Sequence, residues 1–385
     1  MSHAQARHAH PVTPRATEPP TRVDSLDALR GLAVAAMILV NNPGSWTDGY
    51  GFLAHSSWNG WTLADLVFPF FLLIGGVSID FSLSRRLERP RSGERVLPML
   101  ARRATLLFAL GLLLNGFPHY AQLSTLRYFG VLQRIGLCYF VGATLFLRTG
   151  ARGQALVALA LLAGYWLMLA LVPVPGVGAG VLAPEANLVG YFDDRLFHGH
   201  LYRDGFDPEG LLSTLPAVAT TLIGMLAGRW LRSSAAGRRK TIGLVVCGVA
   251  LVAAGEVADR WIAINKQLWT SSFVLLSGGL GLIALAACFE AIDRRGFRRP
   301  AAPFVMLGSN ALAIYLLSTL VARLMESFEI PAGATVESLR LFLYEHLFAS
   351  WAGTLRGSLL FAVTYLLLWM IPTVQLYRRR MFLRI

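Results

Sequence analysis

The chain has 385 residues, of which 55% are hydrophobic and 15% are charged, with a formal net charge of +13. Soluble domains carry about 25% charged residues, so this composition excludes an ordinary soluble protein and favours one built for lipid. The positive charge does not indicate a nucleic-acid partner, because the arginines cluster in short loops between apolar runs.

Residues 1–22 are polar and rich in proline, which predicts a disordered cytoplasmic tail. Residues 23–385 are predicted to form one transmembrane domain. Its apolar runs lie near 27–42, 62–83, 104–118, 129–147, 154–173, 211–231, 241–258, 268–290, 303–323 and 355–376. Most of them approach the ~20 residues that a helix needs to cross a bilayer. The predicted fold class is all-α, a polytopic integral membrane protein with about ten transmembrane helices.

Loops rich in arginine alternate with loops that are poor in Lys and Arg. The basic loops lie near 85–95, 229–240, 294–299 and 378–384, and the others near 43–61, 174–210 and 324–354. Cytoplasmic loops of membrane proteins carry the excess of Lys and Arg. We therefore expect both termini in the cytoplasm, with 174–210 as the largest extracytoplasmic loop. His55 then lies on, or just below, the extracytoplasmic face.

A cluster of polar side chains surrounds His55, between the first two apolar runs. Asn41, Asn42 and Asn59 share its loop, and Asp65 lies within the first turn of the next run. Polar groups at membrane depth are costly and usually mark a pathway or a reaction site. Histidine is well suited to proton transfer near neutral pH when a neighbour fixes its tautomer. Spacing alone leaves open whether His55 is catalytic or a structural loop residue.

Ionisable groups inside the apolar runs have competing interpretations. Asp27 and Arg30 are three residues apart, so they can pair on one helix face or contact a substrate. Arg134, beside Gln133, needs a carboxylate such as Asp65 or Asp80, backbone carbonyls, or a ligand phosphate.

Two further polar positions are left with two interpretations each. Lys266 either snorkels or takes part in a site. Asp207 either caps the following helix, with Glu209 in its first turn, or lies at an acceptor entrance. Asn310 lies beside Gly308, where another backbone can approach. Cys138, Cys247 and Cys288 fall within apolar runs and show no metal or disulfide spacing, so we expect no metal.

Eight blocks in this order resemble the family of heparan-α-glucosaminide N-acetyltransferase and its bacterial relatives. The blocks are 25–31, 39–41, 55–60, 65–69, 130–135, 207–210, 265–272 and 308–312. The resemblance implies a membrane acetyltransferase that moves acetyl from cytosolic acetyl-CoA to an amino sugar or similar acceptor on the far side. The catalytic histidine of the family maps onto His55 and its neighbouring asparagine onto Asn41.

With this resemblance, we expect His55 to act as base or nucleophile, assisted by Asn41 and Asp65. The expected substrate-binding residues are Arg30, Asn42, Trp58, Asn59, Gln133, Arg134, Asn265, Lys266, Trp269 and Asn310. CoA phosphates favour arginine partners, and Arg102 and Arg103 are also available. The expected partners are acetyl-CoA, an extracytoplasmic amino-sugar or glycan acceptor and the lipid bilayer, without nucleic acid. The expected location is a bacterial inner membrane.

A transporter or flippase for a sugar-linked or lipid-linked substrate is the main alternative. Such a protein would show paired broken helices and an internal repeat, and no convincing repeat is visible. A membrane scaffold gains little from buried polar groups. The sequence leaves the acceptor and the oligomeric state open, a homodimer included.

Overall fold

The computed structural model describes residues 23–88, 96–118, 123–332 and 335–382. Most of these residues are helical and very few are in strands, which confirms the all-α class. The predicted tail, 1–22, lies outside the described residues. The main helices are α1 Asp24–Asn41, α2 Leu63–Leu87, α3 Val96–Gly116, α4 Val131–Arg148, α5 Ala151–Leu171, α6 Leu188–Phe197, α7 Thr214–Arg232, α8 Gly237–Ala258, α9 Ser271–Cys288, α10 Arg298–Ser309, α11 Ala311–Ser327 and α14 Thr354–Arg378.

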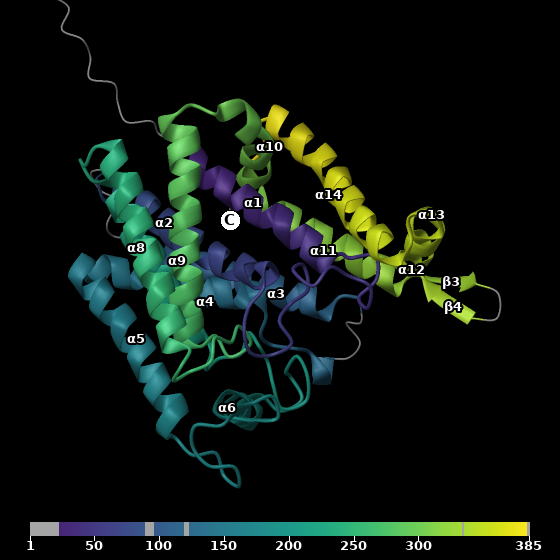
Figure 1. Ribbon diagram of the computed structural model, residues 1–385, viewed down its shortest axis with the longest axis horizontal. Helices are drawn as coiled ribbons and strands as arrows, with labels where there is room; N and C mark the ends of the chain where they lie inside the picture. The colour runs from purple at the N-terminus through teal and green to yellow at the C-terminus, as the bar shows by residue number, and fades with distance from the viewer. Residues whose placement is uncertain (1–22, 89–95, 119–122, 333–334, 383–385) are drawn as a thin grey trace, which may run out of the picture.

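The remaining elements are short. They are the helical turns η1 Leu123–Thr125, η2 Phe289–Arg294, α12 Leu339–Tyr344, η3 Glu345–Ala349 and α13 Ser350–Ala352. Strands β1 Leu182–Ala183 and β2 Ala186–Asn187 form one antiparallel hairpin, and β3 Glu329–Ala332 and β4 Thr335–Ser338 form another. In Figure 1, α14 lies with α1, α10 and α11 on one side, α5, α8 and α9 lie on the other, and α6 lies at one end.

Seven helices in the described part of the chain are long and apolar enough to cross a membrane: α2, α3, α4, α5, α8, α9 with η2, and α14. The pair α10 and α11, bent by 71° at Asn310, raises the number to eight if it forms one span. The prediction of ten spans is therefore not confirmed. The other two predicted runs are helices, but α1 carries Asp24, Asp27 and Arg30 within 18 residues, and α7 is made less apolar by three threonines, Pro216 in its first turn and two arginines in its last turn.

Two helix pairs cross with their backbones in contact at glycines. A Cβ on Gly76 of α2 would lie 2.0 Å from Thr221 O of α7, and one on Gly224 would lie 2.0 Å from Leu73 O. A Cβ on Gly308 of α10 would lie 1.8 Å from the carbonyl oxygen of α1 residue Asp27. Small residues permit this close approach of membrane helices. These crossings fix α1 and α2, whose adjoining ends carry the His55 loop.

Candidate active site

The first turn of α2 holds the His55 side chain in place. Asp65 Oδ2 accepts hydrogen bonds from the backbone N–H groups of Ser56 (3.1 Å) and Thr62 (3.0 Å). Asp65 Oδ1 lies 2.8 Å from His55 Nδ1. Because an ionised carboxylate only accepts hydrogen bonds, Nδ1 carries a proton, and in the neutral imidazole this tautomer leaves the lone pair on Nε2. The side chain of Asp65 is 1% exposed and that of His55 is 46% exposed, so a reactant can reach the imidazole.

A second loop, between α8 and α9, closes on the His55 loop. The N–H of Gly60 donates to Ile264 O (2.7 Å), and Asn265 Nδ2 donates to Asn59 Oδ1 (3.1 Å). Asn265 is fully buried, and Trp269 is 1% exposed with a φ of 53°. A bulky residue rarely adopts this left-handed conformation, so the surrounding packing must hold it. The predicted residues Asn59 and Asn265 thus join the two loops.

Lys266 projects from this second loop onto the His55–Asp65 pair. Its Nζ lies 3.0 Å from His55 Nδ1, 3.4 Å from His55 Nε2 and 3.3 Å from Asp65 Oδ1. Burial lowers the pKa of the Lys266 ammonium, an effect that the carboxylates of Asp65 and Glu209 oppose. The ammonium turns into the site, so the snorkelling interpretation is wrong.

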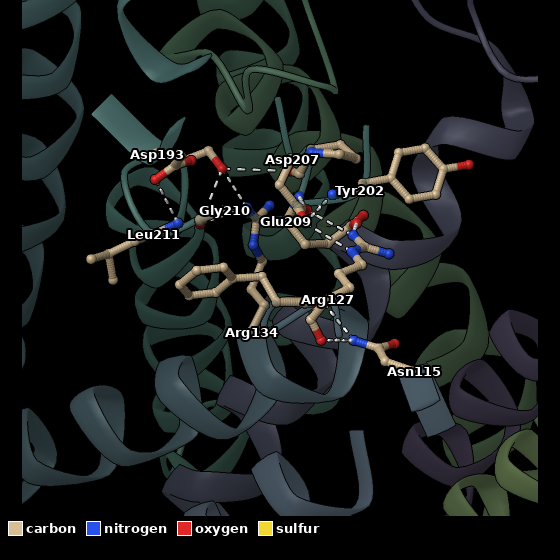
Figure 2. A network of polar contacts seen from close by, with 12 residues as sticks. Asn115, Arg127, Arg134, Asp193, Tyr202, Asp207, Glu209, Gly210 and Leu211 are labelled. Carbon is tan, nitrogen blue, oxygen red and sulfur yellow. Dashed lines mark hydrogen bonds and ion pairs between the residues drawn. The ribbon is translucent and has the colours of Figure 1, made fainter. Parts of the chain in front are cut away.

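Arg127, Asp207 and Glu209 form a network of ion pairs (Figure 2). Arg127 Nε and Nη2 donate to both oxygens of Asp207, at 2.8 and 2.7 Å, and Nη2 also donates to Glu209 Oε2 (2.5 Å). Asp207 Oδ2 further accepts a hydrogen bond from the N–H of Tyr202 (3.0 Å). Asp207 does not cap α7, which begins at Thr214. The capping interpretation is wrong because the helix begins beyond this turn; Asp207 pairs with Arg127, from the segment before α4, and accepts the N–H of Glu209 (2.9 Å).

Arg134 lies at the inner edge of the same network and is 1% exposed. Its Nη2 donates to Gly210 O (3.2 Å) and to Ser213 Oγ, and its Cζ lies 5.0 Å from the centre of the Trp269 ring. A guanidinium over an aromatic face is attracted to the ring electrons. Carbonyl, hydroxyl and ring contacts therefore hold Arg134, whereas Asp80 pairs with arginines of α7.

Asp193 joins α6 to the start of α7. Its Oδ1 accepts hydrogen bonds from the N–H groups of Leu211 (3.1 Å) and Leu212 (3.3 Å), as Figure 2 shows for Leu211. Its Oδ2 has no hydrogen-bond partner among the described residues. Burial raises the pKa of Asp193 from 3.8 to about 6, against the effect of these hydrogen bonds and of Arg134.

Protonation of Asp193 should stabilise the fold as the pH falls. The folded protein binds this proton more tightly than the unfolded chain does, so the contribution of Asp193 to the free energy of unfolding increases from about pH 6 towards pH 4. We expect the stability of wild type relative to Asp193→Asn to increase by about 2 kcal/mol over this range. Thermal unfolding of the two proteins in detergent at each pH measures the difference. A difference that does not depend on pH would contradict the assignment.

An elongated cavity of about 760 Å³ lies among α1, α2, α3, α4, α10 and α11. On α2 it extends from Phe71 to Arg85, which is roughly 21 Å at 1.5 Å per residue. Arg30, Arg85 and Arg103 supply basic groups, and Val131, Leu132 and Ile135 belong to an apolar end. Asp65 lies about 9 Å further along α2 than Phe71. The cavity therefore approaches the His55 site at one end and has arginines along the rest.

The family described as "Heparan-alpha-glucosaminide N-acetyltransferase, catalytic" matches residues 22–248. This chain belongs to that family. The matched region includes His55, Asp65 and Arg134, whereas the Lys266 loop lies beyond it.

Two curated members of the family are similar to most of this chain. The heparan-alpha-glucosaminide N-acetyltransferase of Homo sapiens is 32% identical over 364 residues, covering 80% of this chain and 54% of that protein. The protein of the same name from Mus musculus is 31% identical over 353 residues, covering 77% of this chain and 53% of that protein. The chain thus spans about half the length of these relatives.

The other predicted site residues of this family member fall into two groups. Asn41 and Trp58 lie near the His55 end: Asn41 is exposed at the last position of α1, and Trp58 Nε1 donates to Leu182 O (2.7 Å). Asn42, Gln133 and Asn310 are buried. Asn42 Nδ2 donates to Ile38 O (2.8 Å), Gln133 packs against Gly111 of α3, and Asn310 occupies the break between α10 and α11.

Arg30 is the predicted residue that lines the cavity. It donates to Asp27 Oδ1 (2.8 Å), as one of its two interpretations predicts, and to Ser78 Oγ (2.8 Å). Sequence reasoning missed Arg127 and Asp193 as parts of the polar network. An arginine directly before an apolar run was the available signal for Arg127. Among the described residues, no group of three or more His, Cys, Asp or Glu side chains is arranged to hold a metal.

Proposed function

We propose that this chain is an integral-membrane acetyltransferase that moves acetyl from acetyl-CoA to the amine of an amino sugar or a similar acceptor. The observation that carries the proposal is the His55–Asp65 pair, with its buried carboxylate and half-exposed imidazole. The amine attacks the thioester carbonyl, Nε2 of His55 accepts the proton, and CoA leaves as the thiolate. Nε2 can also act as the nucleophile, which would leave acetyl on the protein before the acceptor enters.

The cavity suits a long donor. Coenzyme A has phosphates at one end and a thioester at the other, joined by a flexible and partly apolar arm. Arginine is the preferred partner of phosphate, and Arg30, Arg85 and Arg103 line the cavity away from His55.

Met37 of α1 lines the cavity as well, and Asn41 follows one turn later on the same helix face. We assign Asn41 as the hydrogen-bond donor to the thioester carbonyl as negative charge develops there.

Acetyl transfer by the purified chain tests this function. We expect the protein to transfer labelled acetyl from acetyl-CoA to glucosamine or another primary amine in a panel of amino sugars. Label retained on the protein before acceptor is added would assign the nucleophilic route. Failure to transfer acetyl to any amine, by protein that is folded and binds acetyl-CoA, would refute the function.

Arg103 provides a test of donor binding with a neighbouring control. Arg103 lines the cavity, whereas Arg102 is exposed on another face of α3. A hydrogen bond to a charged group contributes about 1.5–3 kcal/mol, so Arg103→Ala should weaken acetyl-CoA binding roughly 10- to 100-fold. Calorimetric titration measures the Kd, and Arg102→Ala should bind like wild type. Equal losses in the two variants would place the phosphates elsewhere.

We propose a bacterial inner membrane as the location, with both termini in the cytoplasm and His55 on the opposite side. The arginine-rich loops support this orientation. Cysteines introduced at Ser234, between α7 and α8, and at Glu185, between α5 and α6, test it; both positions are exposed. In intact cells a membrane-impermeant thiol reagent should label the second position and spare the first, with wild type as control. Labelling of Ser234→Cys would reverse the orientation.

One observation favours a transporter as the second candidate. The 71° bend between α10 and α11 lies at the cavity, and transporters build substrate sites from broken helices of this kind. Uptake of an amino sugar into proteoliposomes without acetyl-CoA would support transport, and acetylation by detergent-solubilised protein would support the enzyme.

A further inference from the structure

The ammonium of Lys266 is not placed to donate a hydrogen bond along the lone-pair direction of either His55 ring nitrogen. Lys266 Nζ lies within 3.4 Å of both Nδ1 and Nε2, whose lone pairs point in diverging directions within the ring plane. An atom that is close to both nitrogens must therefore lie above the plane of the ring, near the edge that carries them. The in-plane direction at Nδ1 is already taken by Asp65 Oδ1, at 2.8 Å. Within the described part of the chain, Nε2 therefore remains open in the plane of the ring, with the amine of Lys266 beside it.

We propose that Lys266 is a positioning residue that keeps the His55 imidazole neutral, so that Nε2 is ready to accept the acceptor's proton. This inference rests on the proposed function of His55. A positive charge beside a histidine disfavours a second positive charge on the ring. Asp65 alone would favour the imidazolium, and its attraction would keep a proton on Nε2. Lys266, 3.3 Å from Asp65 Oδ1, offsets that attraction while Asp65 still orients the ring.

Two carboxylates near Lys266 favour the charged form of its amine. Among the described residues, the charged groups within hydrogen-bonding distance of His55 are Asp65 of α2 and Lys266 of the second loop. Burial lowers the pKa of Lys266, Asp65 and Glu209 oppose this effect, and Arg134 adds to it. The Lys266 side chain is 18% exposed, which limits screening by water. Its loop is held by buried Asn265, whose Oδ1 accepts the N–H of Leu268 (2.8 Å).

Replacement of Lys266 by Met should shift the acid limb of the pH–rate profile to higher pH by about one unit. Acetyl transfer near pH 6 would then fall roughly tenfold more than transfer near pH 8. Lys266→Arg keeps the charge and should keep the wild-type profile. Gln267→Met is the matched control, because Gln267 Nε2 also bridges the two loops, donating to Ser57 O (3.0 Å), but carries no charge. Lys266→Gln provides a second uncharged variant with a polar side chain.

A second measurement does not depend on acetyl transfer. Diethyl pyrocarbonate reacts with neutral imidazole, and mass spectrometry of the His55 peptide reports the extent of reaction at each pH. In the wild type, Lys266→Arg and Gln267→Met, His55 should stay reactive to lower pH than in Lys266→Met or Lys266→Gln. The same pH dependence in all five proteins would overturn the inference, as would a shift in Lys266→Arg or Gln267→Met equal to that in Lys266→Met. Because wild-type protein without transferase activity still yields this result, failure of the proposed function remains distinguishable.

Discussion

His55→Ala should lower the rate of acetyl transfer by about 10²–10⁴-fold, the range over which general base catalysis contributes. The imidazole is the exposed member of a pair whose carboxylate is buried. Its removal therefore takes away the group that accepts the proton and leaves the carboxylate without its orienting role. Acetyl-CoA binding should change little, because His55 does not line the cavity. Steady-state transfer to an amino sugar and calorimetric titration with acetyl-CoA measure the two quantities.

His198 offers a control on another loop. Its Nδ1 lies 2.9 Å from Asp194 Oδ1, so it also has a carboxylate partner, but its side chain is 87% exposed and the pair lies on the surface of α6. His198→Ala should leave both transfer and binding unchanged. Wild-type transfer by His55→Ala would remove His55 from the mechanism, and equal losses in the two variants would indicate a general effect on the fold.

Arg127→Met should lower stability by about 3–5 kcal/mol, the cost of leaving a buried charge without its partner. Asp207 is fully buried and receives two hydrogen bonds from Arg127, which also pairs with Glu209. Without the guanidinium, both carboxylates must be protonated or remain uncompensated. The variant should lose helical circular dichroism at a temperature several degrees lower than wild type, in the same detergent.

An exposed ion pair provides the comparison for this prediction. Arg295 pairs with Glu290 at 2.9 Å, but its side chain is 64% exposed. Surface pairs contribute about 0–1 kcal/mol, so Arg295→Met should unfold close to the wild-type temperature. Equal shifts in the two variants would show that the buried network contributes no more than a surface pair.

Local sequence patterns predicted the helices and the contact between His55 and Asp65. Asp65 is ten residues after His55 and in the first turn of a helix, so its contact with the imidazole follows from chain connectivity and helix capping. The approach of Lys266 does not follow in this way, because it lies 211 positions from His55. It depends on how α9 packs beside α2, and side-chain packing between distant segments leaves no periodic signal in the sequence.

The count of membrane spans and the partner of Arg134 illustrate the same limit. Hydropathy identifies α1 and α7 as apolar runs, but the charged and polar residues in them lower their apolar character, so length and composition alone do not mark them as spans. Charge complementarity suggested a carboxylate for Arg134. The structure supplies Gly210 O, Ser213 Oγ and the Trp269 ring instead, and none of these carries a formal charge that sequence reasoning could match.

The helix α2 carries Asp65 in its first turn and Arg85 in its last. Twenty residues of one helix separate the two by about 30 Å, a distance set by the rise of the helix, and the glycine crossing with α7 holds α2 in its place in the fold. In the proposed function, we expect α2 to set a minimum length for the donor, which must engage arginine at one end while it presents its acyl group at the other. Shorter acetyl thioesters could not contact the arginines and the His55 site at the same time. The protein would then select its donor by length as much as by the reactivity of the thioester.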